Sequence, residues 1–242
     1  YHFNNFAQVK YTVSGDRINP LLDVTFDGVH IIDGDLVSAK PLIDIKLNDE
    51  NKFIALDDTT VFALYLKTPS DNESKRIWFG GTNPYLVQFV PASLPDNTAS
   101  ITMNPNFTID GKYELLVESK DASNNKSGDF AYRISFEVIN QSTITEVMNY
   151  PNPFSTSTRF VFTLTGSVIP DYFKIRIMTI SGRVIREITQ DELGQIRIGR
   201  NITEYAWDGK DEFGDRLGNG IYFYKVFTGI EGEMIEKRET QA

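Results

Sequence analysis

The feature that most constrains this 242-residue chain is a long series of short apolar alternations, each closed by a turn signal. Because side chains of a strand point alternately to opposite faces, an apolar–polar alternation of period two predicts half-buried β-strands. Asp27-Gly28, Asp33-Gly34 and Asp110-Gly111 are the strongest turn signals, since Asp-Gly favours tight hairpins. Apart from a short turn around residues 49–55, no window carries a helical period. An all-β fold of antiparallel sheets is therefore expected.

The alternations fall into two groups. The first group predicts strands at 9–13, 21–26, 29–32, 42–47, 61–67, 76–79, 86–90, 100–103, 113–119 and 130–139. The second predicts strands at 160–164, 173–180, 184–188, 197–198, 203–207, 221–228 and 233–237. Strands at this regular spacing indicate two tandem immunoglobulin-like or fibronectin-like antiparallel β-sandwiches.

A proline-rich stretch separates the two groups. Pro151 and Pro153 cannot donate ladder hydrogen bonds, and they push the residues before them into extended conformations. Tyr150 to Phe154 is therefore expected to be a stiff, extended entry to a second domain. The polar linker at 140–143 sets the predicted domains at 1–142, which includes an N-terminal extension, and 143–242. A linker this short is expected to restrict the relative motion of the domains without abolishing it.

Composition excludes several classes of protein and site. The formal net charge is −9 and there is no basic run, so a nucleic-acid partner is not expected. No apolar run approaches the length of a membrane-spanning helix. The chain has no cysteine, which excludes disulfides, thiol catalysis and thiolate metal sites within it. The first residues do not form a signal peptide. The sequence is thus expected to be a piece, or a mature fragment, of a longer protein.

Four ordered motifs in the second segment carry a family resemblance. In chain order they are Tyr150-Pro151-Asn152-Pro153-Phe154, Ser181-Gly182-Arg183-Val184, Trp207-Asp208-Gly209 and Asn219-Gly220-Ile221-Tyr222. Together they resemble the immunoglobulin-like domain of flagellar hook-capping proteins and the C-terminal sorting domains of type IX secretion cargo in Bacteroidetes. The first segment, through Asp110-Gly111-Lys112-Tyr113 and the Asp121–Asn125 loop, resembles bacterial extracellular immunoglobulin-like domains.

The resemblance implies a non-catalytic C-terminal region of a secreted or cell-surface protein. Its role would be type IX sorting, surface attachment or spacing, with secretion or attachment machinery as the partner and no cofactor. The implied sorting-motif residues are Tyr150, Pro151, Asn152, Pro153, Gly182, Asn219, Gly220 and Tyr222. In such domains the last strand ends in basic residues, and 233–237 is the candidate for it here. Flagellar hook capping is the least supported interpretation, because it requires helical assembly segments before the second segment, where the sequence predicts strands instead.

Catalytic and metal sites have little sequence support. No Gly-x-Ser-x-Gly elbow occurs, and His2 and His30 are the only histidines, so no catalytic residue is assigned. The acidic loops offer calcium candidates, because Ca²⁺ prefers oxygen ligands. These candidates are Asp121 and Asn125 in one loop, and Asp208, Asp211 and Asp215 in another. Neither loop matches a defined calcium motif, and a solvated turn is the alternative.

The runner-up function is a glycan- or protein-binding accessory module of a larger extracellular enzyme, such as a gingipain-type peptidase. Exposed aromatic residues would provide a platform on which sugar rings stack. The candidates are Trp78, Phe79, Tyr85 and Tyr113, followed by Tyr222 and Tyr224. Most aromatic residues in alternating strands belong to a core, which is the alternative for each of them.

Overall fold

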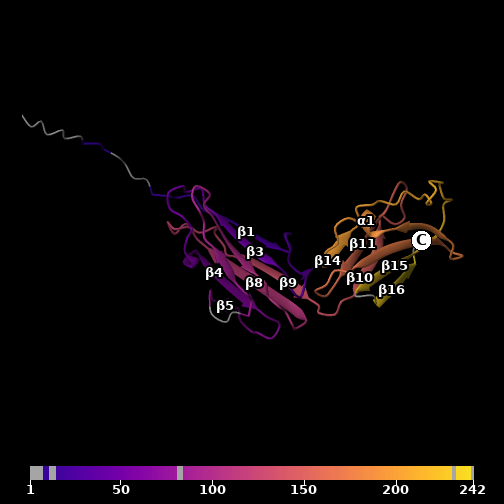
Figure 1. Ribbon diagram of the computed structural model, residues 1–242, viewed down its shortest axis with the longest axis horizontal. Coiled ribbons are helices and arrows are strands. Elements are labelled where there is room, and N and C mark those ends of the chain that lie inside the picture. Colours follow the sequence, from indigo (N-terminus) through magenta and orange to yellow (C-terminus); the bar gives the residue numbers. More distant parts are fainter. Residues whose placement is uncertain (1–7, 11–14, 81–83, 231–232, 241–242) are drawn as a thin grey trace, which may run out of the picture.

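The computed structural model describes residues 8–10, 15–80, 84–230 and 233–240, and shows two β-sandwiches that follow one another along the long axis (Figure 1). The predicted all-β fold of two tandem immunoglobulin-like sandwiches is confirmed. Among the described residues, no helix is long and apolar enough to cross a membrane.

The first sandwich pairs a four-stranded sheet with a five-stranded sheet. The four-stranded sheet has the order β1 (Leu21–Phe26), β3 (Ile43–Asn48), β7 (Thr98–Met103) and β6 (Gln88–Val90). The other has the order β2 (Asp35–Val37), β9 (Tyr132–Val138), β8 (Gly111–Ser119), β4 (Phe62–Lys67) and β5 (Lys75–Ile77). All pairs are antiparallel except β2 with β9. The four-stranded order corresponds to the ABED sheet of an immunoglobulin domain, and the central strands β9, β8 and β4 of the other sheet correspond to its strands G, F and C, with β2 and β5 added at the edges.

The second sandwich repeats this plan with fewer strands. One sheet has the order β10 (Ile144–Tyr150), β11 (Arg159–Leu164) and β14 (Gly199–Ile202). The facing sheet has the order β13 (Val184–Ile188), β12 (Tyr172–Thr179), β15 (Tyr222–Ile230) and β16 (Glu233–Thr240). One helical turn, α1 (Gln190–Leu193), precedes β14, and a 3-10 turn, η1 (Thr59–Val61), precedes β4 in the first sandwich.

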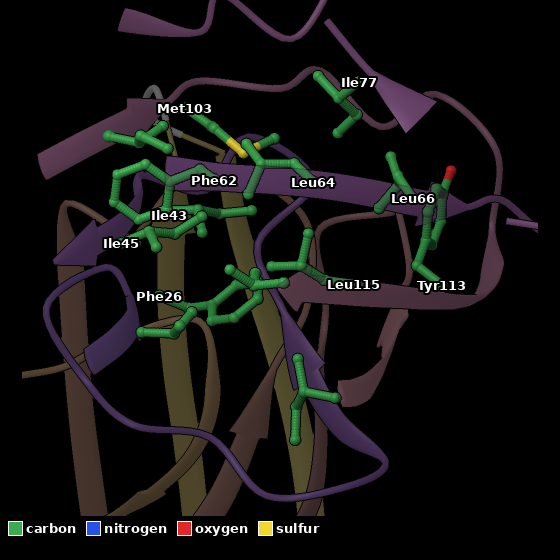
Figure 2. Packing of buried hydrophobic residues seen from close by; sticks show 14 of the residues in the cluster. Phe26, Ile43, Ile45, Phe62, Leu64, Leu66, Ile77, Met103, Tyr113 and Leu115 are labelled. Carbon is green, nitrogen blue, oxygen red and sulfur yellow. The ribbon is translucent and has the colours of Figure 1, made fainter. Parts of the chain in front are cut away.

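Two separate apolar clusters fill the sandwiches. Along β3, Ile43, Ile45 and Leu47 are fully buried while the residues between them point outward, as period two requires. Figure 2 shows Ile43 and Ile45 beside the side chains of β4 and β8 in the core between the sheets. The second cluster is built on Phe160, Phe162, Phe173, Ile175 and Trp207, together with the side chains around them.

Both sandwiches contain a tyrosine corner, in which a tyrosine at the start of a long strand bonds back to the preceding loop. The Tyr113 hydroxyl donates to the Ile109 carbonyl oxygen at 2.9 Å. The Tyr222 hydroxyl donates to the Gly218 carbonyl oxygen at 2.5 Å. These two tyrosines end the Asp-Gly-x-Tyr and Asn-Gly-Ile-Tyr motifs, so each motif has a structural role in fixing the loop that leads into the strand.

The structure differs from several strand predictions. Residues 29–32 and 203–207 are not strands; Val29 and Trp207 form only isolated bridges. The turn predicted at 49–55 is not helical. Within 9–13, Val9 and Lys10 lie in no strand, and the remaining positions are outside the described residues. Strand β10 precedes the proline-rich stretch, so this stretch is a loop inside the second sandwich rather than the entry to it.

Hydrogen bonds fix the junction between the sandwiches. The Asp110 carboxylate accepts from both the backbone and the side-chain nitrogen of Asn140, at 2.8 Å each. Ala39 in the first sandwich donates its N–H to the Gly166 carbonyl oxygen at 3.1 Å. Strand β2 also contacts β14, where a Cβ on Gly199 would lie 2.6 Å from the Leu36 carbonyl oxygen. The linker is therefore bonded to the first sandwich through Asn140, and the two sandwiches also contact each other directly, which restricts their relative motion.

Candidate functional site

All four sequence motifs meet at one end of the second sandwich, called here the motif pole. It consists of the β10–β11 loop (151–158), the β12–β13 turn (180–183) and the β14–β15 connection (203–221). Tyr150 pairs with Arg159 at this end of β11, whereas Leu164 pairs with Gly199 at the junction end. Because β11 rises about 3.3 Å per residue, the motif pole lies about 17 Å from the junction.

The β12–β13 turn belongs to the same pole because Thr179 is the register partner of Tyr222. Gly182 has a φ of 84° and donates its N–H to the Thr179 carbonyl oxygen at 2.9 Å. A positive φ is readily adopted by glycine, which explains the Ser-Gly pair in this turn. Gly182 therefore positions the end of β12 rather than contributing a functional group.

The proline-rich loop is held by its neighbours. Both the Tyr150–Pro151 and the Asn152–Pro153 peptide bonds are cis. The Pro151 carbonyl oxygen accepts from the buried Thr158 hydroxyl at 2.8 Å. The ring of Phe154 packs on Trp207, with centroids 5.4 Å apart. Tyr150, Pro151, Asn152 and Pro153 are all exposed, so this loop presents surface to solvent at the pole.

Trp207 anchors the loops of the pole to the core of the second sandwich. Its side chain is 4% exposed and its indole N–H donates to the Lys210 carbonyl oxygen at 2.8 Å. Its ring meets Tyr222 edge-on at 5.9 Å. The three rings of Phe154, Trp207 and Tyr222 thus join the first, third and fourth motifs, and they line a hollow of about 460 Å³ with Leu217 and the Gly218–Gly220 turn.

The acidic loop at the pole is closed by its own hydrogen bonds. Asp211 Oδ1 accepts the N–H groups of Phe213 and Asp215, at 3.0 and 2.9 Å. Asp208 forms an ion pair with Lys210 at 2.6 Å, and this hydrogen bond lowers the pKa of the Asp208 carboxyl. Asp208, Asp211 and Asp215 do not form a group of three converging carboxylates among the described residues.

The loop at Asp121 has the same design. Asp121 Oδ1 accepts the Asn125 N–H and Oδ2 accepts its side-chain amide, both at 2.7 Å. Asn124, with a φ of 69°, occupies the position of Gly214. The two loops share this pattern: the aspartate carboxylate accepts the N–H four residues later, and the residue before that one takes a positive φ. Their acidic composition is therefore explained by loop closure.

The described part of the chain does contain one cluster of three carboxylates that lie close together. Carboxylate oxygens of Asp16, Asp49 and Asp121 lie within 4.8 Å of one another, with Asp49 and Asp121 buried. Burial raises the pKa of the Asp49 carboxyl, and the neighbouring Asp121 and Asp16 carboxylates raise it further. The sequence singled out Asp121 and Asn125 but not Asp16 or Asp49, since these residues are distant in the chain.

Most of the predicted aromatic platform lies in or against the cores. Tyr113 and Tyr224 are buried, and Phe79, Tyr85 and Tyr222 pack on the core clusters. Trp78 is 66% exposed and lies under the Arg76 guanidinium, 4.4 Å from the ring centroid. His30, in an exposed loop, contacts the exposed Asp23 carboxylate at 2.6 Å, and His2 lies outside the described residues.

Comparisons with known proteins find no matching family model and no matching curated protein. Solved structures do match. Dimeric latent PorU from Porphyromonas gingivalis is similar at a TM-score of 0.38 and 19% identity, over 94% of this chain and 20% of that chain. The chain thus spans about a fifth of PorU.

Two further solved structures give lower scores. A chaperone–tip adhesin complex of CFA/I fimbriae biogenesis has a TM-score of 0.28 and 14% identity, over 93% of this chain and 100% of that chain. The FN1–FN3 domains of chicken CNTN1 have a TM-score of 0.27 and 11% identity, over 91% and 67%. Identities and scores of this size do not identify a family, and the fold assignment rests on the sheets described above.

Proposed function

We propose that this chain is a non-catalytic region of a secreted or cell-surface bacterial protein, and that its motif pole is a recognition surface for sorting or attachment machinery. The first sandwich and the bonded junction serve as a spacer that holds the pole away from whatever precedes it. A type IX secretion pathway is the specific proposal, supported by the resemblance of the four motifs.

One observation supports this proposal: of four motifs spread over more than 70 residues of sequence, three line one hollow at the end of the second sandwich, and the Ser-Gly turn lies at the same end. Folding alone requires the glycines, Trp207 and Tyr222, because they close turns and pack. It does not require the exposed Tyr150 or Asn219 side chains, which are available for contact with a partner.

The test fuses a reporter to the N-terminus of the chain and follows its export in a type IX-competent bacterium. We expect the fusion to reach the cell surface, and we expect a version that ends before β10 to be retained. Tyr150→Ala combined with Asn219→Ala changes the pole and should reduce export. Arg200→Ala changes an exposed residue at the junction end and serves as the matched control.

Circular dichroism of each purified variant establishes that the fold is intact. Retention of the folded parent fusion would contradict the sorting role. Equal export of the pole variant and the control would remove the motif pole as the recognised surface. The glycan-binding alternative is tested separately on an array, where Trp78→Ala should abolish any signal that the parent chain gives.

A further inference from the structure

The fourth motif contains the single Asn-Gly pair of the sequence, Asn219-Gly220. Both residues are exposed, lie in the bend that precedes β15, and line the hollow of about 460 Å³ at the motif pole. The proposed recognition function uses Asn219 only as a contact surface. Its side-chain amide is also a reactive group, because the backbone nitrogen of a following glycine can attack the amide carbon and close a five-membered ring.

No hydrogen bond holds either reactive group. Among the described residues, the Asn219 amide has no partner and the Gly220 N–H donates to no backbone carbonyl oxygen. A Cβ added to Gly220 would meet no atom within 4 Å, so no neighbouring group crowds this residue. The tyrosine corner anchors the bend at Gly218 and Tyr222, but it leaves the amide and the N–H between these two residues unbonded.

Other asparagines of the chain differ from Asn219 in one of these conditions. The amides of the buried Asn97 and Asn201 are held by hydrogen bonds to the backbone. Asn72 is exposed, lies in a bend and has no hydrogen bond among the described residues, but it is followed by Glu73. A side chain on the following residue crowds the attacking nitrogen and restricts its backbone, whereas glycine does neither. Asn72 is therefore the matched control.

We propose that Asn219 is a modification site at which the chain deamidates without an enzyme. The Gly220 nitrogen bonds to Cγ of Asn219, the bond from Cγ to the amide nitrogen breaks, and ammonia leaves with the proton of the Gly220 N–H. Water then opens the succinimide ring. Cleavage of the new N–Cγ bond gives aspartate, and cleavage of the bond from that nitrogen to the main-chain carbonyl carbon gives isoaspartate. The net reaction consumes one water and releases one ammonia, with no oxidant or reductant.

Deamidation changes the charge and the backbone of the fourth motif. Both products place a carboxylate in the hollow at the motif pole. Arg216 lines the same hollow and forms no ion pair among the described residues, so the new charge and an unpaired cation share one hollow. Isoaspartate also lengthens the main chain by one carbon directly before β15, inside the bend that the tyrosine corner closes.

The test incubates the purified full chain at pH 6 and at pH 8 and follows each asparagine by peptide mapping with mass spectrometry. We expect Asn219 to convert at least tenfold faster than Asn72, into both aspartate and isoaspartate. The conversion should be faster at pH 8, because base removes the proton of the attacking nitrogen. Gly220→Ala should slow it at least tenfold, and this variant should fold because its added Cβ meets no atom within 4 Å.

A parallel sample unfolded in urea separates the effect of the sequence from that of the fold. Because the bend leaves both reactive groups unbonded, the rate in the folded chain should lie within tenfold of the rate in urea. A folded-chain rate below this range, equal rates at Asn219 and Asn72, or an unchanged rate in Gly220→Ala would overturn the proposal. The measurement involves no export, so a chain that deamidates but is not exported contradicts only the sorting function, and an exported chain that keeps Asn219 intact contradicts only the modification.

Discussion

Replacing Asp49 with asparagine should stabilise the first sandwich, because it removes a buried negative charge from beside two others. The carboxylates of Asp16, Asp49 and Asp121 converge within 4.8 Å, and no Lys or Arg is paired with them in the described structure. Asp49 Oδ1 accepts the Asn51 N–H at 3.2 Å, which an asparagine oxygen can also do. The substitution therefore keeps the loop bond while it removes the charge.

The magnitude follows from Coulomb's law. At 4.8 Å and an effective dielectric constant near 20, two like charges repel by about 3 kcal/mol. Screening at the partly exposed Asp16 reduces this value. The long Asn97 Nδ2 contact with Asp49 Oδ2, at 3.3 Å, is lost at a cost of about 1 kcal/mol. A net gain of about 1–2 kcal/mol at pH 7 is therefore expected for Asp49→Asn.

The assay is urea unfolding between pH 4 and pH 8 in the presence of EDTA. The pKa of Asp49 in the folded protein is raised above its ordinary value of 3.8, so the parent chain loses stability as pH rises through the interval between those two values. Asp49→Asn lacks this loss. A variant that is less stable than the parent at pH 7, or that shows the same pH slope, would refute the electrostatic reasoning.

Calcium binding is tested in a separate thermal-unfolding experiment without EDTA. A ligand that binds only the folded protein raises its melting temperature by mass action. An unchanged melting temperature of the parent chain on addition of calcium chloride removes Asp121 and Asn125 as calcium ligands. A rise that disappears in Asp49→Asn would instead locate a cation at the three carboxylates.

Three further predictions concern the junction, the corners and the loops. Gly199→Ala should lower the free energy of unfolding by about 1–3 kcal/mol more than Gly182→Ala does, as measured by thermal unfolding. Both glycines have a positive φ, but only at Gly199 would the added Cβ lie 2.6 Å from a backbone atom, the Leu36 carbonyl oxygen. Tyr113→Phe should lower stability by about 1 kcal/mol in urea unfolding, and an unchanged midpoint would show that water replaces its bond to Ile109. Asp211→Ala removes the acceptor of two backbone N–H groups and should cost about 1–2 kcal/mol, whereas Asp211→Asn should recover most of it, with amide hydrogen exchange of Phe213 as the readout.

Most strands could be predicted from the sequence because one face of each is buried, so that apolar and polar residues alternate. The prediction missed strands in which this alternation is interrupted. Strand β10 is the clearest case: Ile144, Val147 and Asn149 point inward, a spacing of three and then two. Glu146 has a φ of 50° and the pairing with β11 shifts register there, which marks a bulge. An extra residue moves the following side chains to the other face, so a search for strict alternation misses the strand.

Residues 203–207 show the opposite error. Their apolar alternation is real, but backbone bonds go elsewhere: Glu204 and Tyr205 donate to the carbonyl oxygens of Leu193 and Glu192 around α1. A pattern of burial does not specify which partner satisfies the backbone. The cluster of Asp16, Asp49 and Asp121 could not be predicted for a related reason, because only the folded loops bring these distant residues together.

The meeting of the four motifs at one pole, in contrast, follows from strand order. In an antiparallel sandwich successive connections alternate between the two ends, so the connections after β10, β12 and β14 share one end while those after β11 and β13 share the other. The motifs occupy every second connection. The junction with the first sandwich uses the other end, at Gly166 and Gly199. Substitutions at the motif pole can therefore alter recognition without disturbing the junction, which is why pole and junction variants are a fair pair of tests.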